Sequence, residues 1–179
     1  INNEAINKDV ITFVANTSRN KIIAGLLRNS LEPNLGLTGT GQEVSIMRST
    51  LLRKGILIDD ETGTRISLAP DDDKMKAVLD VIVSFVTDAK KNGQVSFAQL
   101  YERLISPQYH IGLRNGVIPI YIAAVFHEYS EDIILENEFG QLPLIADTIQ
   151  AINSAPGEYN LKYLDWNPEK QQFVTDIAN

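Results

Sequence analysis

Apolar residues recur at three- to four-residue intervals through most of the first seventy residues and then give way to two short apolar runs. This spacing predicts helices over 2–14, 18–29 and 41–54. Their apolar positions are Ile6, Val10, Ile11 and Phe13; Ile22, Ile23, Leu26 and Leu27; and Ile46, Met47, Leu51 and Leu52. Ser18 and Thr40 are the expected N-caps of the second and third helices, and Gly55 ends the third. The apolar runs lie within 56–68, around an acidic turn that contains Gly63, and predict a hairpin.

The second part of the chain shows the same order of patterns with an added short strand. Broad apolar faces predict helices over 71–91 and 96–104, with a very short strand just before the second of them. A third helix is expected in the almost uncharged run that ends near Tyr129. The segments 132–135 and 141–145 then predict a second hairpin. Helix, strand, helix, helix and hairpin is the order of a winged-helix unit.

These patterns predict a mainly α fold with small β-hairpins, of class α+β, built from tandem winged-helix-like units. The expected division is a first unit over 1–70, a second over 71–145 and a C-terminal extension over 146–179 that packs on the second. The extension shows a short helix that stops at Pro156 and a strand-compatible stretch after it.

The run from Gly116 to Ala124 contains no charged residue, and this limits the functions open to the second unit. The third helix of a winged-helix unit is the one that enters a DNA groove, and affinity for DNA comes mainly from Lys and Arg on phosphates. An uncharged helix at that position is suited to burial. The second unit is therefore expected to serve as an interaction module.

The net charge of −7 is unevenly distributed along the 179 residues. Through Pro70 there are eight Lys and Arg against seven Asp and Glu, whereas the remainder has eight against sixteen. An acidic second half repels a phosphate backbone, so DNA contact is expected only in the first half. The candidate DNA-binding residues are Arg48, Arg53 and Lys54 on the third helix and Arg65 in the hairpin. Solvated helix faces are the usual explanation for scattered cations of this kind and the favoured one here.

No residue pattern indicates catalysis, a cofactor or a metal site. The chain has no cysteine, and its two histidines, His110 and His127, lack a partner at metal-ligand spacing. The loop 38–43 places glycines before a helix, which suits anion binding, but it has no Walker lysine, and Glu43 opposes a phosphate. No apolar run is long enough to cross a bilayer, and the lack of cysteine is compatible with the cytoplasm. The chain opens without Met, which suggests a segment of a larger polypeptide whose catalysis lies elsewhere.

Aromatic residues gather in the second half of the chain. Two of them, Tyr109 and Trp166, lie in loop-like sequence and are the expected contact residues for a protein partner. Tyr121 and Phe126 fall in the apolar helix and are expected in the core.

Two stretches, GLTGTGQEVSIMRSTLLRKGI and FAQLYERLISPQYHIGLRNGVIPIYIAAVF, together resemble a region of very large bacterial P-loop ATPases of the phage-defence (BREX) kind. The matching positions are Gly39, Gly41, Glu43, Pro107, Gly112, Arg114, Gly116 and Pro119. The resemblance implies a winged-helix-like part downstream of an ATPase core, with structural and not catalytic motif residues. On this basis the chain is expected to be a non-catalytic scaffold that makes protein or interdomain contacts. DNA binding through the first half and nucleotide or anion sensing at 38–43 are the alternatives.

Overall fold

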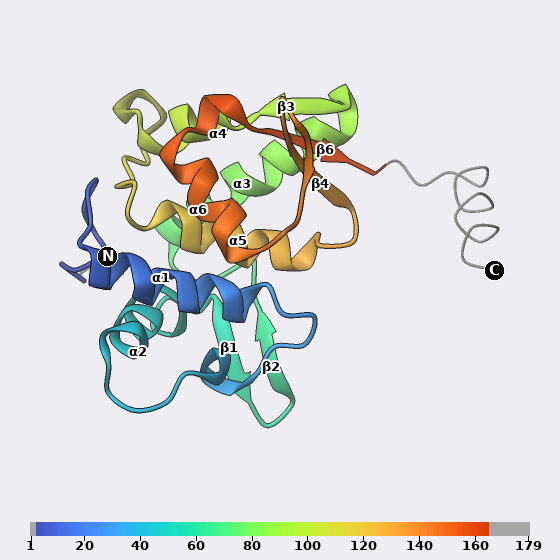
Figure 1. The fold of residues 1–179 in the computed structure, drawn as a ribbon. Helices are drawn as coiled ribbons and strands as arrows, with labels where there is room; N and C mark the ends of the chain where they lie inside the picture. Colours follow the sequence, from blue (N-terminus) through green and yellow to red (C-terminus); the bar gives the residue numbers. More distant parts are fainter. Residues whose placement is uncertain (1–2, 165–179) are drawn as a thin grey trace.

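The computed structural model describes residues 3–164, and over that part of the chain six α-helices and two small antiparallel sheets form an α+β fold (Figure 1). The helices are α1 (Phe13–Leu26), α2 (Gln42–Met47), α3 (Asp73–Asn92), α4 (Phe97–Ile105), α5 (Ile118–Glu128) and α6 (Ala146–Ser154). The strands are β1 (Leu57–Asp60), β2 (Gly63–Ile66), β3 (Gln94–Ser96), β4 (Ile133–Asn137), β5 (Gly140–Leu142) and β6 (Asn160–Tyr163). The expectation of helices with small hairpins is confirmed at this level.

Four short helical turns complete the described part of the chain. Three are 3₁₀ turns, η1 (Pro33–Gly36), η3 (Pro107–Tyr109) and η4 (Pro156–Glu158). The fourth, η2 (Arg48–Leu52), is a π-helical turn that continues α2. Each 3₁₀ turn starts at a proline, whose fixed φ suits the first position of a helical turn.

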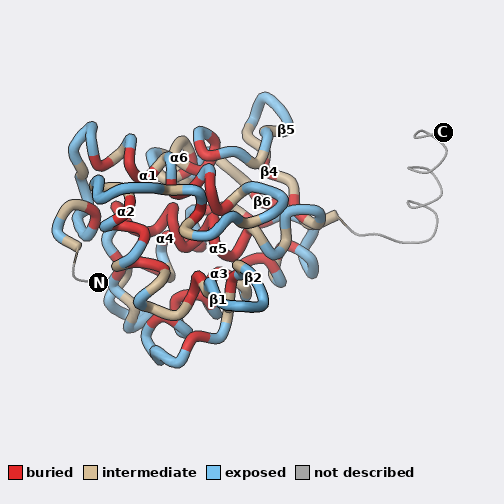
Figure 2. Tube along the Cα trace, turned by 90° about the horizontal axis from the view of Figure 1, so that it is seen from below, coloured by how far each residue is buried: buried red, intermediate tan, exposed pale blue. Residues whose placement is uncertain are grey.

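The helix α5 lies at the centre of the fold. Every residue from Ile118 to Phe126 is buried, and buried backbone runs through the middle of the molecule beside the α5 label in Figure 2. Helices α1, α3 and α6 and strand β2 all contact it. Because no residue in this stretch is charged, its burial incurs no cost of removing a charge from water. The uncharged run noted in the sequence is therefore the core helix, as expected.

The π-helical turn η2 is joined to α5 by a buried hydrogen bond. Its wide turn is closed by Arg53 N–H, which donates to the Arg48 carbonyl five residues earlier at 2.9 Å. The carbonyl of Thr50, inside this turn, accepts a hydrogen bond from the Tyr121 hydroxyl at 3.2 Å. Burial raises the pKa of Tyr121 above its usual range, so the hydroxyl stays protonated and keeps donating.

The two sheets differ in how far apart in sequence their strands lie. In the smaller one, β1 and β2 form a local hairpin that runs from the Leu57–Ile66 pair to the Asp60–Gly63 pair. The larger one has the order β3-β6-β4-β5. Here β6 lies between β3 and β4 and pairs antiparallel with both, so that Leu161 faces Val95 on one side and Leu135 on the other. The segment after α6 is thus part of the sheet.

One hydrophobic core crosses Pro70, the predicted boundary between units. Buried residues of α1, α2, β1 and β2 belong to the same cluster as those of α3 to α6. The contacts of α1 with α5 and α6 carry the core across that boundary, and Pro70 is itself buried. The division at Pro70 remains a sequence-based prediction, and the two parts share their interior.

The predicted helix over 2–14 is wrong. Residues 4–10 form turns and bends, and α1 begins at Phe13, where the Thr12 hydroxyl caps it by accepting Ala15 N–H at 3.1 Å. Ser18, the predicted cap, lies inside α1 and is buried. The Asn3 side chain accepts Ala5 N–H, and this local bond competes with helix formation. The first unit consequently has two helices before its hairpin, and not three.

Tandem winged-helix units are not confirmed. The second part of the chain follows the predicted order from α3 to β5, and the hairpin β4–β5 forms where it was expected. However, β3 pairs with β6 and not with the hairpin. The observed fold is therefore best described as α+β, with a sheet completed by the C-terminal strand.

Replacement of Tyr121 by Phe tests the bond between α5 and η2. The variant leaves the buried Thr50 carbonyl without its donor, which should lower the free energy of unfolding by about 1–3 kcal/mol. Urea denaturation measures this as a lower midpoint with an unchanged slope. Tyr129→Phe is the control, because the Tyr129 hydroxyl has no hydrogen-bond partner among residues 3–164. Equal stability of the two variants would show that the hydrogen bond contributes nothing.

Candidate functional site

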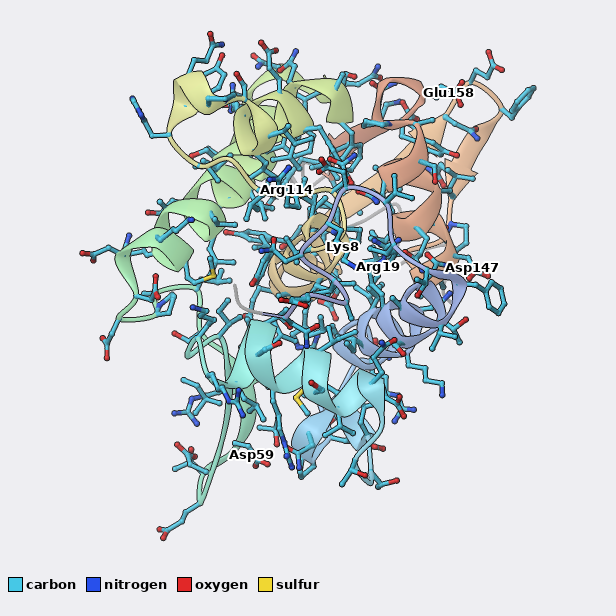
Figure 3. All side chains as sticks on the ribbon, turned by 90° about the vertical axis from the view of Figure 1, so that its left-hand side faces the viewer. Lys8, Arg19, Asp59, Arg114, Asp147 and Glu158 are labelled. Carbon is cyan, nitrogen blue, oxygen red and sulfur yellow. The ribbon has the colours of Figure 1, made fainter. Side chains whose placement is uncertain are left out.

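The N-terminal segment 3–12 lies against the loop that leads into α5, and we call this contact the N-terminal anchor. Gly116 N–H donates to the Lys8 carbonyl at 2.7 Å, and Asn115 N–H donates to Asp9 Oδ1 at 3.3 Å. Arg114 Nη1 forms an ion pair with Asp9 Oδ2, also at 3.3 Å. Lys8, Arg19 and Arg114 are near one another on the face seen in Figure 3. The anchor fixes the first turn of α5 to a segment more than a hundred residues away in sequence.

Only glycine fits at position 116. A Cβ there would collide with the Ile6 carbonyl oxygen, lie 2.5 Å from the Lys8 carbonyl oxygen and lie 3.0 Å from the Ile11 side chain. The backbone of Gly116 is not in the left-handed region, so the requirement comes from close approach of two backbones and not from conformation. The position therefore needs glycine for packing, in agreement with the structural role expected from the sequence.

Arg19 is the buried polar centre of the anchor. Its residue exposure is 5%, and Nη1 donates to the Gly116 carbonyl at 3.0 Å. Nε donates to Gln150 Oε1 at 2.6 Å, and Nη2 donates to Asn16 Oδ1 at 2.9 Å. The three acceptors are neutral and come from α1, α6 and the loop before α5.

Arg19 is buried without a carboxylate partner, and this changes the pKa of its guanidinium group. Desolvation lowers the pKa of Arg19 to about 10, so the guanidinium is still protonated at neutral pH. Over residues 3–164 it forms no ion pair. Arg19 is not among the residues that the sequence singled out. Nothing in its spacing marks it, because its three acceptors come together only in the folded chain.

The remaining residues of the Pro107–Pro119 motif lie in the segment from η3 to the first turn of α5. Arg114 is exposed and carries the ion pair with Asp9, while Pro119 is buried in the first turn of α5. Gly112 has a φ of +61°, a left-handed conformation that favours glycine. Pro107 starts η3, whose last residue, Tyr109, is 44% exposed and accessible to a partner. Trp166, the other predicted contact residue, lies outside the described residues.

The glycine-rich loop 38–43 leads into α2 without the predicted Thr40 cap. Gly41, and not Thr40, is the N-cap, and no side chain caps the helix. The two Glu43 carboxylate oxygens lie 2.9 and 3.0 Å from the position of a Cβ on Gly41. Gly39 has a φ of +83° and no atoms of other residues near its Cβ position. A carboxylate beside the amides of α2 disfavours an anion there.

The four cations proposed for DNA contact differ in their surroundings. Arg48 and Arg53 are exposed and have no ion pair within the described part of the chain. Lys54 lies 3.9 Å from Asp72, the N-cap of α3. Arg65 donates to both carboxylate oxygens of Asp60 at 3.0 and 3.1 Å.

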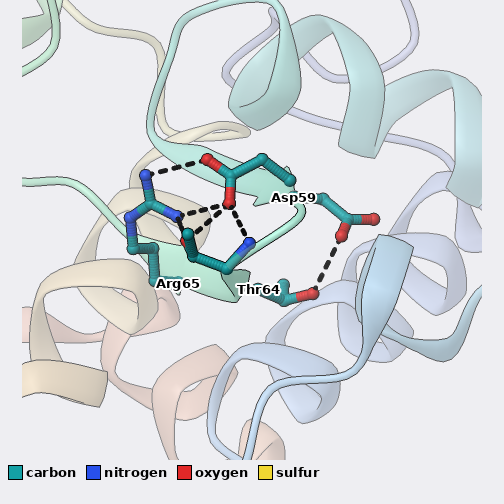
Figure 4. A network of polar contacts seen from close by, with 5 residues as sticks. Asp59, Thr64 and Arg65 are labelled. Carbon is teal, nitrogen blue, oxygen red and sulfur yellow. Dashed lines mark hydrogen bonds and ion pairs between the residues drawn. The ribbon is translucent and has the colours of Figure 1, made fainter.

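Figure 4 shows the Arg65 contacts within the β1–β2 hairpin, where Thr62 also takes part. Hydrogen bonds from Arg65 and Thr62 hold the pKa of Asp60 well below its usual range. The hydrogen bond to Asp60 in turn raises the pKa of Arg65. Both groups therefore stay charged and paired near neutral pH. Half of the predicted basic set is engaged with acidic residues.

Large apolar side chains are exposed at the start of α1 and just before it, among them Val10 and Phe13 from the apolar positions of the predicted helix 2–14. Val10 is 86% exposed, Phe13 84% and Val14 62%. We call these three residues the α1 apolar patch. It directly follows Asp9 of the N-terminal anchor. The sequence predicted a helix here because the apolar spacing of a helix continues through the turns that precede Thr12.

Catalytic or metal-binding constellations do not occur among residues 3–164. No group of three or more His, Cys, Asp or Glu is arranged to hold a metal ion there. His127 Nδ1 lies 2.8 Å from the Leu26 carbonyl, which can only accept, so His127 donates and caps the C-terminal end of α1. Within the same residues, no helix combines the length and apolar character needed to cross a membrane.

Comparisons of the chain with protein-family models, curated proteins and solved structures find no match.

Replacement of Gly116 by Ala tests the close backbone contact at the anchor. The added methyl group must push segment 6–8 away from α5, and the expected loss of unfolding free energy is about 1–3 kcal/mol. Thermal or urea denaturation measures it. Gly157→Ala is the matched control, because a Cβ at Gly157 meets no atom within 4 Å and its φ is unexceptional. A Gly116 variant as stable as this control would contradict the close contact.

A double-mutant cycle between Arg19 and Gln150 tests the buried guanidinium. Lysine cannot reproduce the three directed bonds, so Arg19→Lys should destabilise the fold, and Gln150→Leu should do so by removing one acceptor. The two changes should couple by about 0.5–3 kcal/mol in urea denaturation, because both remove the same bond. Strict additivity of the two losses would show that Arg19 and Gln150 act independently.

Proposed function

We propose that this chain is a non-catalytic module that makes protein or interdomain contacts within a larger bacterial ATPase, in the cytoplasm. The observation that carries the proposal is the α1 apolar patch, where Val10, Phe13 and Val14 are 86%, 84% and 62% exposed. Three large apolar side chains exposed within five positions of the sequence are a feature typical of interaction surfaces. The ATPase, of the kind found in phage defence, is suggested by the resemblance of the Gly39–Glu43 and Pro107–Pro119 motifs.

The position of the patch supports a docking role. It follows the N-terminal anchor, which ties Asp9 to Arg114 and Lys8 to Gly116, so its backbone is held in place before any partner arrives. An exposed side chain on a fixed backbone loses less conformational entropy on binding than one on a free segment. Tyr109 and Ile105, which are 44% and 37% exposed, lie in and before η3 and extend the apolar character of this side of the molecule.

Burial of α5 favours a protein partner over DNA. In a winged-helix unit the helix in this position would enter the major groove, but here Ile118 to Phe126 are all buried. The chain from Asp71 onward also carries twice as many acidic as basic residues. A phosphate backbone would be repelled from this part.

DNA binding through the first half is the second candidate function. The observation in its favour is that Arg48 and Arg53 are exposed beside η2 and have no ion pair within the described part of the chain. Their guanidinium groups are free to contact phosphates.

A fluorescence-anisotropy titration with short duplex DNA separates these two functions. Contact through the α1 apolar patch predicts no saturable binding at about 50 or 200 mM salt, and no effect of the Arg48→Ala, Arg53→Ala, Lys54→Ala triple variant. Binding that weakens steeply with salt and disappears in the triple variant would make the first half a DNA-binding unit. It would contradict the proposed function.

Site-specific photo-crosslinking tests the patch directly. A benzoylphenylalanine at position 13 should give a discrete crosslink to another part of the parent ATPase in cells. The control carries the same group at the exposed position 24, roughly 16 Å further along α1 at the usual helical rise. The patch is not the docking surface if position 13 gives no crosslink or only the same products as position 24.

A further inference from the structure

A pocket of about 380 Å³ lies at the tip of the hairpin β4–β5. Its lining comes from two segments, Asn137, Glu138 and Phe139 of the hairpin turn and Gly157, Glu158 and Asn160 of η4 and β6. Glu158 lies at the edge of the molecule in Figure 3, away from Lys8 and Arg114. The pocket is thus separate from the α1 apolar patch.

Both walls of the pocket are fixed by hydrogen bonds that involve the backbone. Asn137 Oδ1 accepts Phe139 N–H at 2.9 Å, and Asn137 pairs with Gly140 across the turn. On the other wall, Glu158 N–H donates to the Ala155 carbonyl at 3.0 Å. Asn160 pairs with Glu136 of β4, which joins the two walls through the sheet. The pocket is therefore a preformed feature of the fold.

The lining combines uncompensated negative charge with an exposed aromatic ring. Phe139 lies at the tip of the hairpin turn, where its ring is 87% exposed and has no packing role in the core. Glu138 and Glu158 are exposed and form no ion pair within residues 3–164, whereas the neighbouring Glu136 pairs with Lys162 at 3.2 Å. No lysine or arginine lines the pocket. The two remaining polar side chains, Asn137 and Asn160, are amides.

We propose that this pocket binds one arginine side chain of a partner polypeptide. A guanidinium is planar, carries five donors and stacks on aromatic rings, which suits a lining that has two carboxylates, Glu138 and Glu158, and the aromatic ring of Phe139. The volume is at the lower end of the range for ligand pockets and suits a single side chain. The inference rests on the proposed function only in taking the partner to be a polypeptide.

The chemistry of the lining disfavours other ligands. A calcium ion takes six to eight oxygen ligands, and only two carboxylates line this pocket. Over the described residues, no cluster of three or more potential metal ligands occurs. Anions are repelled by the two glutamates. An ammonium group would gain the charge contacts, but it lacks the planar stacking on Phe139.

An NMR titration of the ¹⁵N-labelled chain with a capped glycine–arginine peptide tests the proposal. The uncharged control is the same peptide with citrulline in place of arginine. The arginine peptide should shift the amides of Phe139, Gly140, Gly157 and Glu158 saturably, with a Kd on the order of 1–10 mM. Citrulline keeps the shape but removes the charge, and should bind at least about fivefold more weakly. Glu158→Gln and Phe139→Ala should each weaken binding by roughly threefold or more.

Glu102→Gln is the matched control, because Glu102 is exposed on α4 and lies outside the pocket. It should leave the Kd unchanged. Equal binding of the citrulline peptide, equal effects of Glu102→Gln and Glu158→Gln, or absence of saturable shifts would each overturn the proposal. Calcium chloride that produces the same pattern of shifts at lower concentration would assign the pocket to a cation instead.

These outcomes are independent of the test of the α1 apolar patch. If the peptide fails to bind while position 13 crosslinks, the pocket assignment is wrong and the interaction function stands. If the peptide binds while position 13 gives no specific crosslink, the patch is wrong and the arginine pocket stands.

Discussion

Burial of a helix without charge is the constraint on which the rest of this structure depends. Residues Ile118 to Phe126 are all enclosed, and α1, α3, α6 and β2 take their places by packing on them. The hydrophobic effect favours this arrangement at about 25 cal/mol per Å² of apolar surface removed from water, but it is not directional. The direction and rotation of α5 have to be set by polar contacts at its borders.

Two such contacts are present, and both use a side chain to satisfy a backbone carbonyl. Tyr121 donates to Thr50 in the π-helical turn η2, and Arg19 donates to Gly116 just before α5. In each case the two partners lie more than seventy residues apart, so the bonds join segments that are distant in sequence. Burying Arg19 without a counter-ion has a desolvation cost, which three hydrogen bonds and the packing of the core offset. Both contacts fix the position of α5 relative to its neighbours.

Local patterns identified many of the elements, and contacts between distant residues explain most of the misses. The helices α3, α4 and α5 and both hairpins follow from apolar spacing and turn residues, because these signals lie within a few positions of each other. The turns at 4–10 were missed because Asn3 and Thr12 bond locally to the backbone while the apolar spacing continues past them. The place of β6 between β3 and β4 was not predictable, since a strand's neighbours depend on tertiary packing. Gly116 was among the positions matched to the structural motif, but nothing in the sequence indicated its partner, the buried Arg19.

The surface divides into an apolar side near the N-terminal anchor and an acidic, aromatic pocket at the β4–β5 tip. Both features project from a rigid core whose central helix is inaccessible, which is the arrangement expected of a scaffold. Amide hydrogen exchange of the intact chain tests this account most directly. If α5 is a permanent core helix, its amides from Tyr121 to Phe126 should be among the slowest and exchange only through global unfolding. Exchange of these amides through a local opening of much lower free energy would show that α5 becomes accessible, and would contradict the account.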